Sequence, residues 1–212
     1  MKSFDELRLN WHGETAWVVG SGSTLGYVKP RFFHGKRVIS VNHSAQVHGF
    51  TPSFVFSHYH SVIRDALMPL SLGVTMRHDT ITGYEWVDPP INVVLFDTPY
   101  RSPAGPDWDP FARPDGDLLY GSTSLHGAMH LACHLGAASV ILVGADCGWV
   151  DGHDRILGYP QGENPPESVL GIFERHNRRM KQWLQERYDV DIHSLNPFIN
   201  LNLEGHDFRG AS

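Results

Sequence analysis

Small hydroxyl residues and glycines stand at two places where a helix is expected to begin. The first is Gly20-Ser21-Gly22-Ser23, directly after an apolar run, and the second is Ser122-Thr123. Glycines allow a backbone to approach a phosphate closely, and free N–H and hydroxyl groups then donate hydrogen bonds to it. The first group matches neither a Walker A loop nor the dinucleotide fingerprint, because no Gly-Lys-Ser/Thr follows and the third glycine is Gly26. A tight strand-to-helix turn explains the same residues.

Two further polar side chains close apolar runs. Asn42 ends the run 37–41 and Asp146 ends the run 139–145. An amide at the end of a strand could hydrogen-bond a ribose, a phosphate or a hydroxyl, or simply turn the chain. The carboxylate of Asp146 could anchor Mg²⁺, orient a ribose or brace a loop.

Three histidines, His126, His130 and His134, recur every four residues and therefore share one helical face. A zinc-binding helix of the His-Glu-x-x-His type needs a glutamate after its first histidine, and Gly127 stands there. We therefore expect a partly polar helix face and no metal site. Cys133 and Cys147 lack metal-type spacing, which predicts reduced and inert thiols.

His176 lies within the apolar stripe of a second predicted helix. That stripe consists of Val169, Ile172, Phe173, Met180, Trp183 and Leu184. A histidine on a buried face is usually a core residue, but near the mouth of a cleft it could act as a general base. Arg175, Arg178 and Arg179 on this helix either suit a phosphate or form a solvated face. His58 and His60 follow an apolar run and lie nearer the predicted cleft.

The elements that must position these residues are visible in the pattern. Seven apolar runs predict strands over residues 16–20, 37–42, 53–57, 74–78, 92–97, 139–146 and 189–195. Several are continuous and β-branched, as in strands covered on both faces. One helix is predicted from Ser124 to Leu135, with Gly136 at its C-terminal cap, and another from an N-cap at Ser168 to Tyr188.

Strand–helix–strand order predicts an α/β fold: a Rossmann-like, mostly parallel sheet with helices on both faces, formed by residues 1–212 as a single domain. Two long polar loops, 98–120 and 148–166, follow the carboxyl ends of strands. Loops of this length inside a compact domain are usually lids, binding loops or disordered. Ligands of open α/β sheets bind at that end, so we expect a cleft there.

Composition narrows the function classes. The chain has 212 residues, 41% hydrophobic and 19% charged, and a formal net charge of −6, which argues against a surface that tracks nucleic acid as a whole. It has no apolar run of membrane-spanning length, and its first residues lack the apolar core of a signal peptide, so a cytoplasmic location is expected. The sequence leaves little room for a separate acceptor domain, so homo-oligomerisation is a possible way to complete the site.

The assembled pattern resembles the MptE-like family, whose characterised members are archaeal 6-hydroxymethylpterin diphosphokinases. It is more distantly similar to the bacterial sialyltransferases of glycosyltransferase family 42, and both groups have Rossmann-like sheets. The stretches that carry the resemblance are VVGSGSTL (18–25), VISVNHS (38–44), residues 121–148 and IHSLNPFINL (192–201). An acid common after the third strand of the family is replaced here by Ser57-His58.

The resemblance implies roles for individual residues. The donor nucleotide would contact Gly20, Ser21, Gly22, Ser23 and Asn42, its phosphate would bind Ser122 and Thr123, and Asp146 would lie beside it. His176 would correspond to the general base of the sialyltransferases. Tyr159 would correspond to a tyrosine that assists the departing phosphate.

These observations predict a nucleotide-dependent transferase, in the first place a glycosyltransferase that moves a sugar from a nucleotide-sugar donor to a hydroxyl acceptor without a cofactor. His176, or His58 or His60, would deprotonate the acceptor, while Ser122 and Tyr159 stabilise the departing phosphate. Candidate acceptors range from a glycan or a lipid-linked sugar to a pterin or a modified DNA base.

The alternative is a diphosphokinase that transfers diphosphate from ATP to a small hydroxymethyl compound such as a pterin. That reaction needs Mg²⁺, held through Asp146 and either Asp151 or Asp154. A third hypothesis is a nucleotide-binding or structural module without catalysis.

Overall fold

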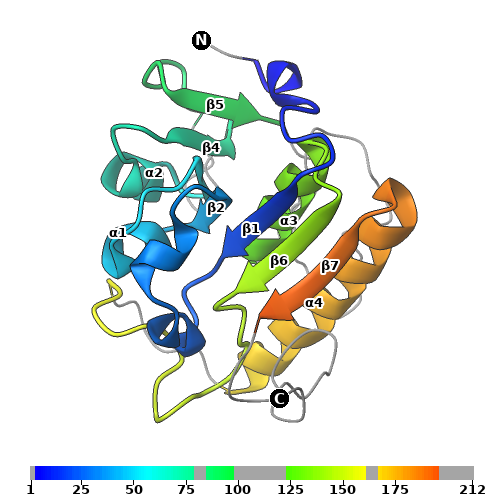
Figure 1. Cartoon of the computed structure of the whole chain (residues 1–212). Coiled ribbons are helices and arrows are strands. Elements are labelled where there is room, and N and C mark those ends of the chain that lie inside the picture. Colours follow the sequence, from blue (N-terminus) through cyan, green and yellow to red (C-terminus); the bar gives the residue numbers. More distant parts are fainter. Residues whose placement is uncertain (1–2, 79–84, 98–122, 161–166, 196–212) are drawn as a thin grey trace.

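The computed structural model describes residues 3–78, 85–97, 123–160 and 167–195, and these form one α/β unit around a seven-stranded sheet (Figure 1). The strands are β1 (Thr15–Val19), β2 (Arg37–Val41), β3 (Phe54–Ser57), β4 (Leu72–Met76), β5 (Val93–Phe96), β6 (Ser139–Val143) and β7 (Asp191–Leu195). Their order is β5-β4-β3-β2-β1-β6-β7, and every neighbouring pair is parallel. All seven predicted strands are confirmed.

Helices cover both faces of the sheet, as predicted. Two long helices, α3 (Ser124–His134) and α4 (Glu167–Tyr188), pack against each other and on one face (Figure 1). The other face carries shorter elements, namely the 3₁₀-helices η2 (Ser23–Tyr27) and η3 (Pro30–Phe33) and the α-helices α1 (Ser44–His48) and α2 (His60–Ala66). A further 3₁₀-helix, η1 (Asp5–Leu7), lies on the α3 face. Within the described ranges, no helix is both long and apolar enough to span a bilayer.

Alternation along the strands explains their continuous apolar runs. In β2, Ile39 and Val41 join the core under α3 and α4, while Val38 joins the core on the opposite face. Ser40, the remaining buried residue of β2, is fully buried. Its hydroxyl accepts a hydrogen bond from the Ala45 N–H at the start of α1, 2.9 Å away. Both faces therefore demand apolar or internally satisfied side chains.

Helix α3 packs unusually close to the sheet because of one glycine. A Cβ at Gly127 would lie 2.2 Å from Cζ of Phe56 on β3. The helix ends at His134, one residue before the predicted end, and Leu135 is its C-cap residue. Gly136 follows with a φ of +84°, the left-handed conformation predicted for it, and its N–H donates to the Cys133 carbonyl at 2.9 Å. Its N-cap residue is Thr123.

Two details predicted for the last helix are wrong. Ser168 is not its N-cap, because α4 already begins at Glu167. Ile172, placed in the apolar stripe, is 37% exposed. Met180 and Leu184 of the predicted stripe are buried, and Leu170 and Asn177 are buried with them. The stripe thus contains an amide, and its phase differs from the predicted one by a fraction of a turn.

The strand order places a topological switch point between β1 and β6. From β1 the chain builds outward through β2 to β5, and it then returns to add β6 and β7 on the other side of β1. The loops that leave β1 and β6 diverge there, which opens a crevice at the carboxyl ends of the two strands.

Candidate functional site

A cleft of about 360 Å³ occupies this crevice. Its walls come from the loops after β1 and β6, the end of β2, the N-terminus of α3 and the inner face of α4. The sequence-predicted residues that line it are Gly20, Ser21, Gly22, Asn42, Thr123, Asp146, Asp154 and Tyr159. Ser122 and the loop 98–120 lie outside the described residues, as do residues 161–166 of the second loop and 196–201 of the last resemblance stretch.

The glycines after β1 allow the two diverging loops to touch. A Cβ at Gly20 would lie 2.5 Å from the Gly144 carbonyl oxygen, and one at Gly22 would lie 2.6 Å from Oδ2 of Asp146. The Thr24 N–H donates to Asp146 Oδ2 at 2.7 Å, and its hydroxyl donates to Oδ1. Burial raises the pKa of this carboxyl, which is 3% exposed. Of the three roles considered for Asp146, the structure shows the bracing of a loop.

Ser23 is turned away from the cleft. Its hydroxyl contacts the carbonyl oxygens of His153 and Arg155, at 2.7 and 3.1 Å. His153 closes a tight hairpin after β6, in which Val150 and His153 exchange backbone hydrogen bonds. The two intervening residues have φ of +50° and +79°, which is the type I′ geometry favoured by Asp-Gly. We call residues 150–153 and the segment that continues to Tyr159 the hairpin arm.

The hairpin arm makes further contacts with the loop after β1 and with η2. The Ile156 N–H donates to the Ser21 carbonyl at 2.8 Å, and the Tyr27 hydroxyl donates to the carboxylate of Asp151. Tyr159 closes the arm at the cleft, and its ring meets that of His43 edge-on at 6.0 Å. The described part of the second long loop is therefore a braced wall of the cleft.

Asn42 holds an unusual backbone conformation at the end of β2. Its φ of +53° is tolerated by asparagine better than by most residues, and its N–H donates to the Phe56 carbonyl at 2.9 Å. Its Oδ1 is buried and has no hydrogen-bond partner among the described residues. An unsatisfied buried acceptor costs about 1–3 kcal/mol, so a donor supplied by a ligand would recover that energy.

The N-terminus of α3 opens into the cleft without a side-chain cap. The Thr123 hydroxyl makes no capping hydrogen bond, and its Oγ1 is another buried atom that lacks a partner in the described structure. Ser124, the first helical residue, also lines the cleft, and its hydroxyl lies 2.9 Å from Nδ1 of His58. Unsatisfied N–H groups and the positive end of the helix dipole favour an anion here.

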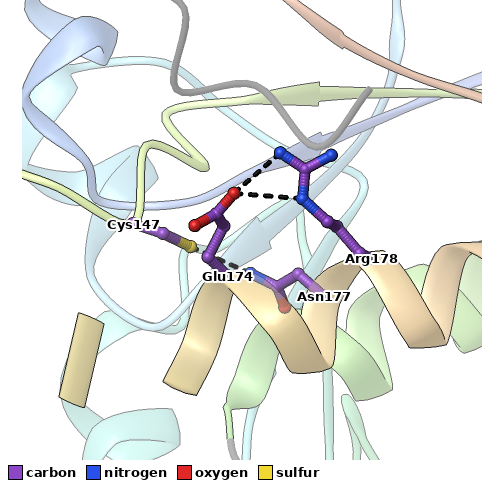
Figure 2. Close-up of polar contacts among 4 residues, drawn as sticks. All are labelled: Cys147, Glu174, Asn177 and Arg178. Carbon is purple, nitrogen blue, oxygen red and sulfur yellow. Dashed lines mark hydrogen bonds and ion pairs between the residues drawn. The ribbon is translucent and has the colours of Figure 1, made fainter. Parts of the chain in front are cut away.

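Asn177 is a cleft residue that sequence reasoning missed. It is 1% exposed, and its Nδ2–H donates to Sγ of Cys147 at 3.0 Å, beside the exposed ion pair of Glu174 with Arg178 (Figure 2). Its Oδ1 is buried and lies beside the ring of His126. The available signal was a lone amide at helical spacing inside an apolar stripe. Burial raises the pKa of the Cys147 thiol to about 12, in keeping with an inert thiol.

Of the three stacked histidines, His126 and His130 are buried and His134 is half-buried, so this face is more enclosed than the partly polar face expected. His130 Nε2 lies 2.6 Å from the Tyr188 hydroxyl, and His134 Nε2 lies 3.2 Å from the Phe4 carbonyl. His126 is fully buried and lies beside Asn177, whose side chain interacts with the imidazole ring. Burial lowers the pKa of His126 and of His130 to about 3, so both are neutral near pH 7.

The four catalytic candidates differ in position, and His60 lies outside the cleft lining, with its Nε2 2.8 Å from the Met76 carbonyl oxygen. Tyr159 lines the cleft, and His58 reaches it through the Ser124 hydroxyl. His176 is half-buried on α4 outside the cleft lining, and burial lowers its pKa. Burial holds the pKa of His58 well below its usual value. The structure therefore places Tyr159 at the cleft and His58 one contact behind Ser124, with His60 and His176 outside the lining.

The carboxylates assigned to Mg²⁺ by the diphosphokinase alternative all have protein partners. Asp146 is held by Thr24, Asp151 by Tyr27 and Asp154 by Arg155. Within the described ranges, no three His, Cys, Asp or Glu side chains gather as a metal site would require. These residues do not fit a magnesium centre as they stand, so we derive no step through one.

Fold and cleft together define a Rossmann-like α/β protein with its crevice at the switch point. A scan of protein-family models and a search of curated proteins both found no match to the chain.

Proposed function

We propose that the chain is a nucleotide-dependent transferase, and in particular a glycosyltransferase that takes a sugar from a nucleotide-sugar donor. The observation that carries the proposal is the uncapped N-terminus of α3, which opens into a switch-point cleft together with buried polar atoms of Asn42 and Thr123 that lack described partners. Such a set suits a ligand that combines an anionic group with hydrogen-bond donors, as a nucleotide does.

The ligand's parts can be assigned to parts of the cleft. A phosphate at the start of α3 would accept from the helix N–H groups and from the hydroxyl of Thr123. A ribose hydroxyl would donate to Oδ1 of Asn42, which stands at the end of β2, where ribose is bound in dinucleotide folds. The glycines after β1 bear no side chains, so they leave room for the ligand on that side of the cleft.

The proposed chemistry is displacement at the anomeric carbon. The acceptor oxygen forms a bond to that carbon, while the carbon–oxygen bond to the phosphate breaks and its electron pair stays on the phosphate oxygen. The acceptor proton would pass through the Ser124 hydroxyl to Nδ1 of His58, 2.9 Å away, and leave to water with the product. Burial lowers the pKa of His58, so the protonated ring would give this proton up readily. The Tyr159 phenol would donate a hydrogen bond to the departing phosphate.

The first test is thermal stability against a panel of nucleoside mono-, di- and triphosphates, each with Mg²⁺ and with EDTA. A ligand that binds only the native state raises the unfolding midpoint. A shift that survives EDTA supports glycosyl transfer, and one confined to ATP with Mg²⁺ transfers support to the diphosphokinase. No shift with any nucleotide would refute the nucleotide site.

Two variants connect such a shift to the cleft. Asn42→Gly removes the amide but keeps a residue that accepts positive φ, and Thr123→Val removes the hydroxyl at constant shape. Each should reduce the shift, while Thr51→Val on an exposed loop should leave it unchanged. Transfer or hydrolysis of the bound nucleotide sugar then separates an enzyme from a module that only binds.

A further inference from the structure

The cleft contains one positively charged side chain among its described residues, Arg155 on the hairpin arm. Its guanidinium is 26% exposed, and Nε lies 3.2 Å from Oδ2 of Asp154, whose side chain is 8% exposed. Sequence reasoning named Asp154 as a possible Mg²⁺ ligand but missed Arg155 as a cleft residue. A half-buried arginine that faces a cleft is a common means of binding phosphate or carboxylate.

The position of Arg155 is fixed at both its main chain and its side chain. Its carbonyl oxygen is a partner of the Ser23 hydroxyl at 3.1 Å, and the next residue is tied to Ser21 by a backbone hydrogen bond of 2.8 Å. The guanidinium lies over the ring of Tyr159, 5.7 Å from its centroid. The Arg155 side chain therefore loses little conformational entropy when a ligand binds, and this favours affinity.

The pair leaves part of the guanidinium available. Asp154 engages Nε, and the terminal nitrogens Nη1 and Nη2 make no hydrogen bond to a described residue. Together they present a planar fork that fits two oxygens of one phosphoryl group. The carboxylates in the same cleft face protein donors, since Asp146 is held by Thr24 and Asp154 by Arg155 itself.

We infer that Arg155 binds the second phosphoryl group of a nucleoside diphosphate whose first phosphoryl group lies at the N-terminus of α3. The donor is therefore a sugar linked to a nucleoside diphosphate. A monophosphate would engage only one of the two anion-binding elements, which come from separate chain segments. The assignment rests on the nucleotide site proposed above and specifies its substrate class.

Arg155 then acts on the departing group. As the carbon–oxygen bond breaks, the electron pair adds negative charge to the terminal phosphate, while the acceptor proton goes to His58 as described. The guanidinium contacts the oxygen atoms where this charge develops, so its contribution grows toward the transition state. No metal ion or other co-reactant enters this step.

Calorimetric titration with matched nucleotides tests the assignment: CMP with CDP, UMP with UDP and GMP with GDP, all in EDTA. The decisive variant is Asp154→Asn/Arg155→Gln, which removes the ion pair as a unit and keeps the net charge. For the nucleoside that binds, we expect the diphosphate to bind wild-type protein at least about 10-fold more tightly than the monophosphate. The double variant should lose on the order of 10- to 100-fold in diphosphate affinity and less than about 3-fold in monophosphate affinity.

Three controls separate a binding role from a structural one. Asp154→Asn alone keeps the guanidinium and should retain the preference for diphosphate. Arg175→Gln, an exposed change on α4, should alter neither affinity. Arg155→Lys keeps the charge but not the fork and should give an intermediate loss. Midpoints without ligand show whether each variant is folded.

The outcomes distinguish the two levels of proposal. Equal affinity for mono- and diphosphate, or equal losses of both in the double variant, would overturn the assignment of Arg155 while the nucleotide site stands. Absence of binding by every nucleotide in wild-type protein would refute the nucleotide site itself. A diphosphate preference that disappears in the double variant supports both.

Discussion

Gly127→Ala tests how closely α3 lies on the sheet. The new Cβ would stand 2.2 Å from Cζ and 2.7 Å from Cε1 of Phe56, whereas carbon atoms in contact are about 3.5–4.0 Å apart. The ring cannot swing aside, because Phe56 is fully buried, stacks on Phe96 with centroids 5.6 Å apart and meets His58 edge-on at 5.2 Å. Either the helix rises or the ring leaves its rotamer.

The magnitude follows from two opposing terms. Overpacking of a filled core costs about 1–3 kcal/mol, and a displacement of more than about 1 Å belongs at the upper end. Replacing glycine by alanine inside a helix returns about 1 kcal/mol. We therefore expect a net loss of about 2 kcal/mol in the free energy of unfolding, or about 4–8 °C in Tm for a chain of this size.

Urea unfolding, followed by far-ultraviolet circular dichroism, measures the change. The matched control is Gly171→Ala in α4, where the nearest atom to a new Cβ is Nη1 of Arg175 at 3.8 Å, so the same substitution should stabilise by about 1 kcal/mol. Adding Phe56→Leu to Gly127→Ala should recover part of the loss relative to the two single variants taken separately. A neutral or stabilising Gly127→Ala would refute the close packing.

The remaining predictions concern protonation, thiols and the hairpin arm. The pKa values of His126 and His130 are about 3 in the folded protein, below the unfolded value of 6.5. As the pH is lowered from 6.5 to 3, the free energy of unfolding should therefore decrease by about 1.4 kcal/mol per pH unit for each histidine. His126→Gln should reduce this slope of ΔG against pH. Burial raises the thiol pKa of Cys133 and of Cys147 to about 12, so a thiol reagent at pH 8 should label both about a thousandfold more slowly in native than in unfolded protein. Ser23→Ala removes the contact to the hairpin arm and should cost about 1 kcal/mol, with faster amide hydrogen exchange confined to that arm.

The fold could be predicted from the sequence because each strand carries its own signal. Runs such as 139–145 are apolar on both faces, and Gly136 marks the end of α3 with a conformation that few other residues adopt. The short helices α1 and α2 were not predicted, since five and seven residues provide too few turns for a helical period. They form because the second face of the sheet needs cover.

The site could be predicted only in part. Glycines and hydroxyl residues at the ends of strands indicated the cleft, but not that Gly22 serves contact with Asp146 or that Ser23 faces a carbonyl. Arg155 and Asn177 were missed because their roles depend on contacts across the fold that local spacing does not encode. From sequence alone, a charged group at such a position is predicted to lie on the surface and an amide in an apolar stripe to lie in the core, because the segments that contact them are not known.

The contact between the β1 and β6 loops joins residues 122 positions apart, Thr24 and Asp146. During synthesis at about 5–20 residues per second, the edge of β1 that will pair with β6 has to wait roughly 6–25 s for its partner. In that interval only strands β1 to β5 are available, so β1 has a partner strand on one side only. Its other edge, which later lies within the sheet, stays unpaired. We therefore expect nascent chains that end before β6 to be bound by chaperones, and release to follow the emergence of β6.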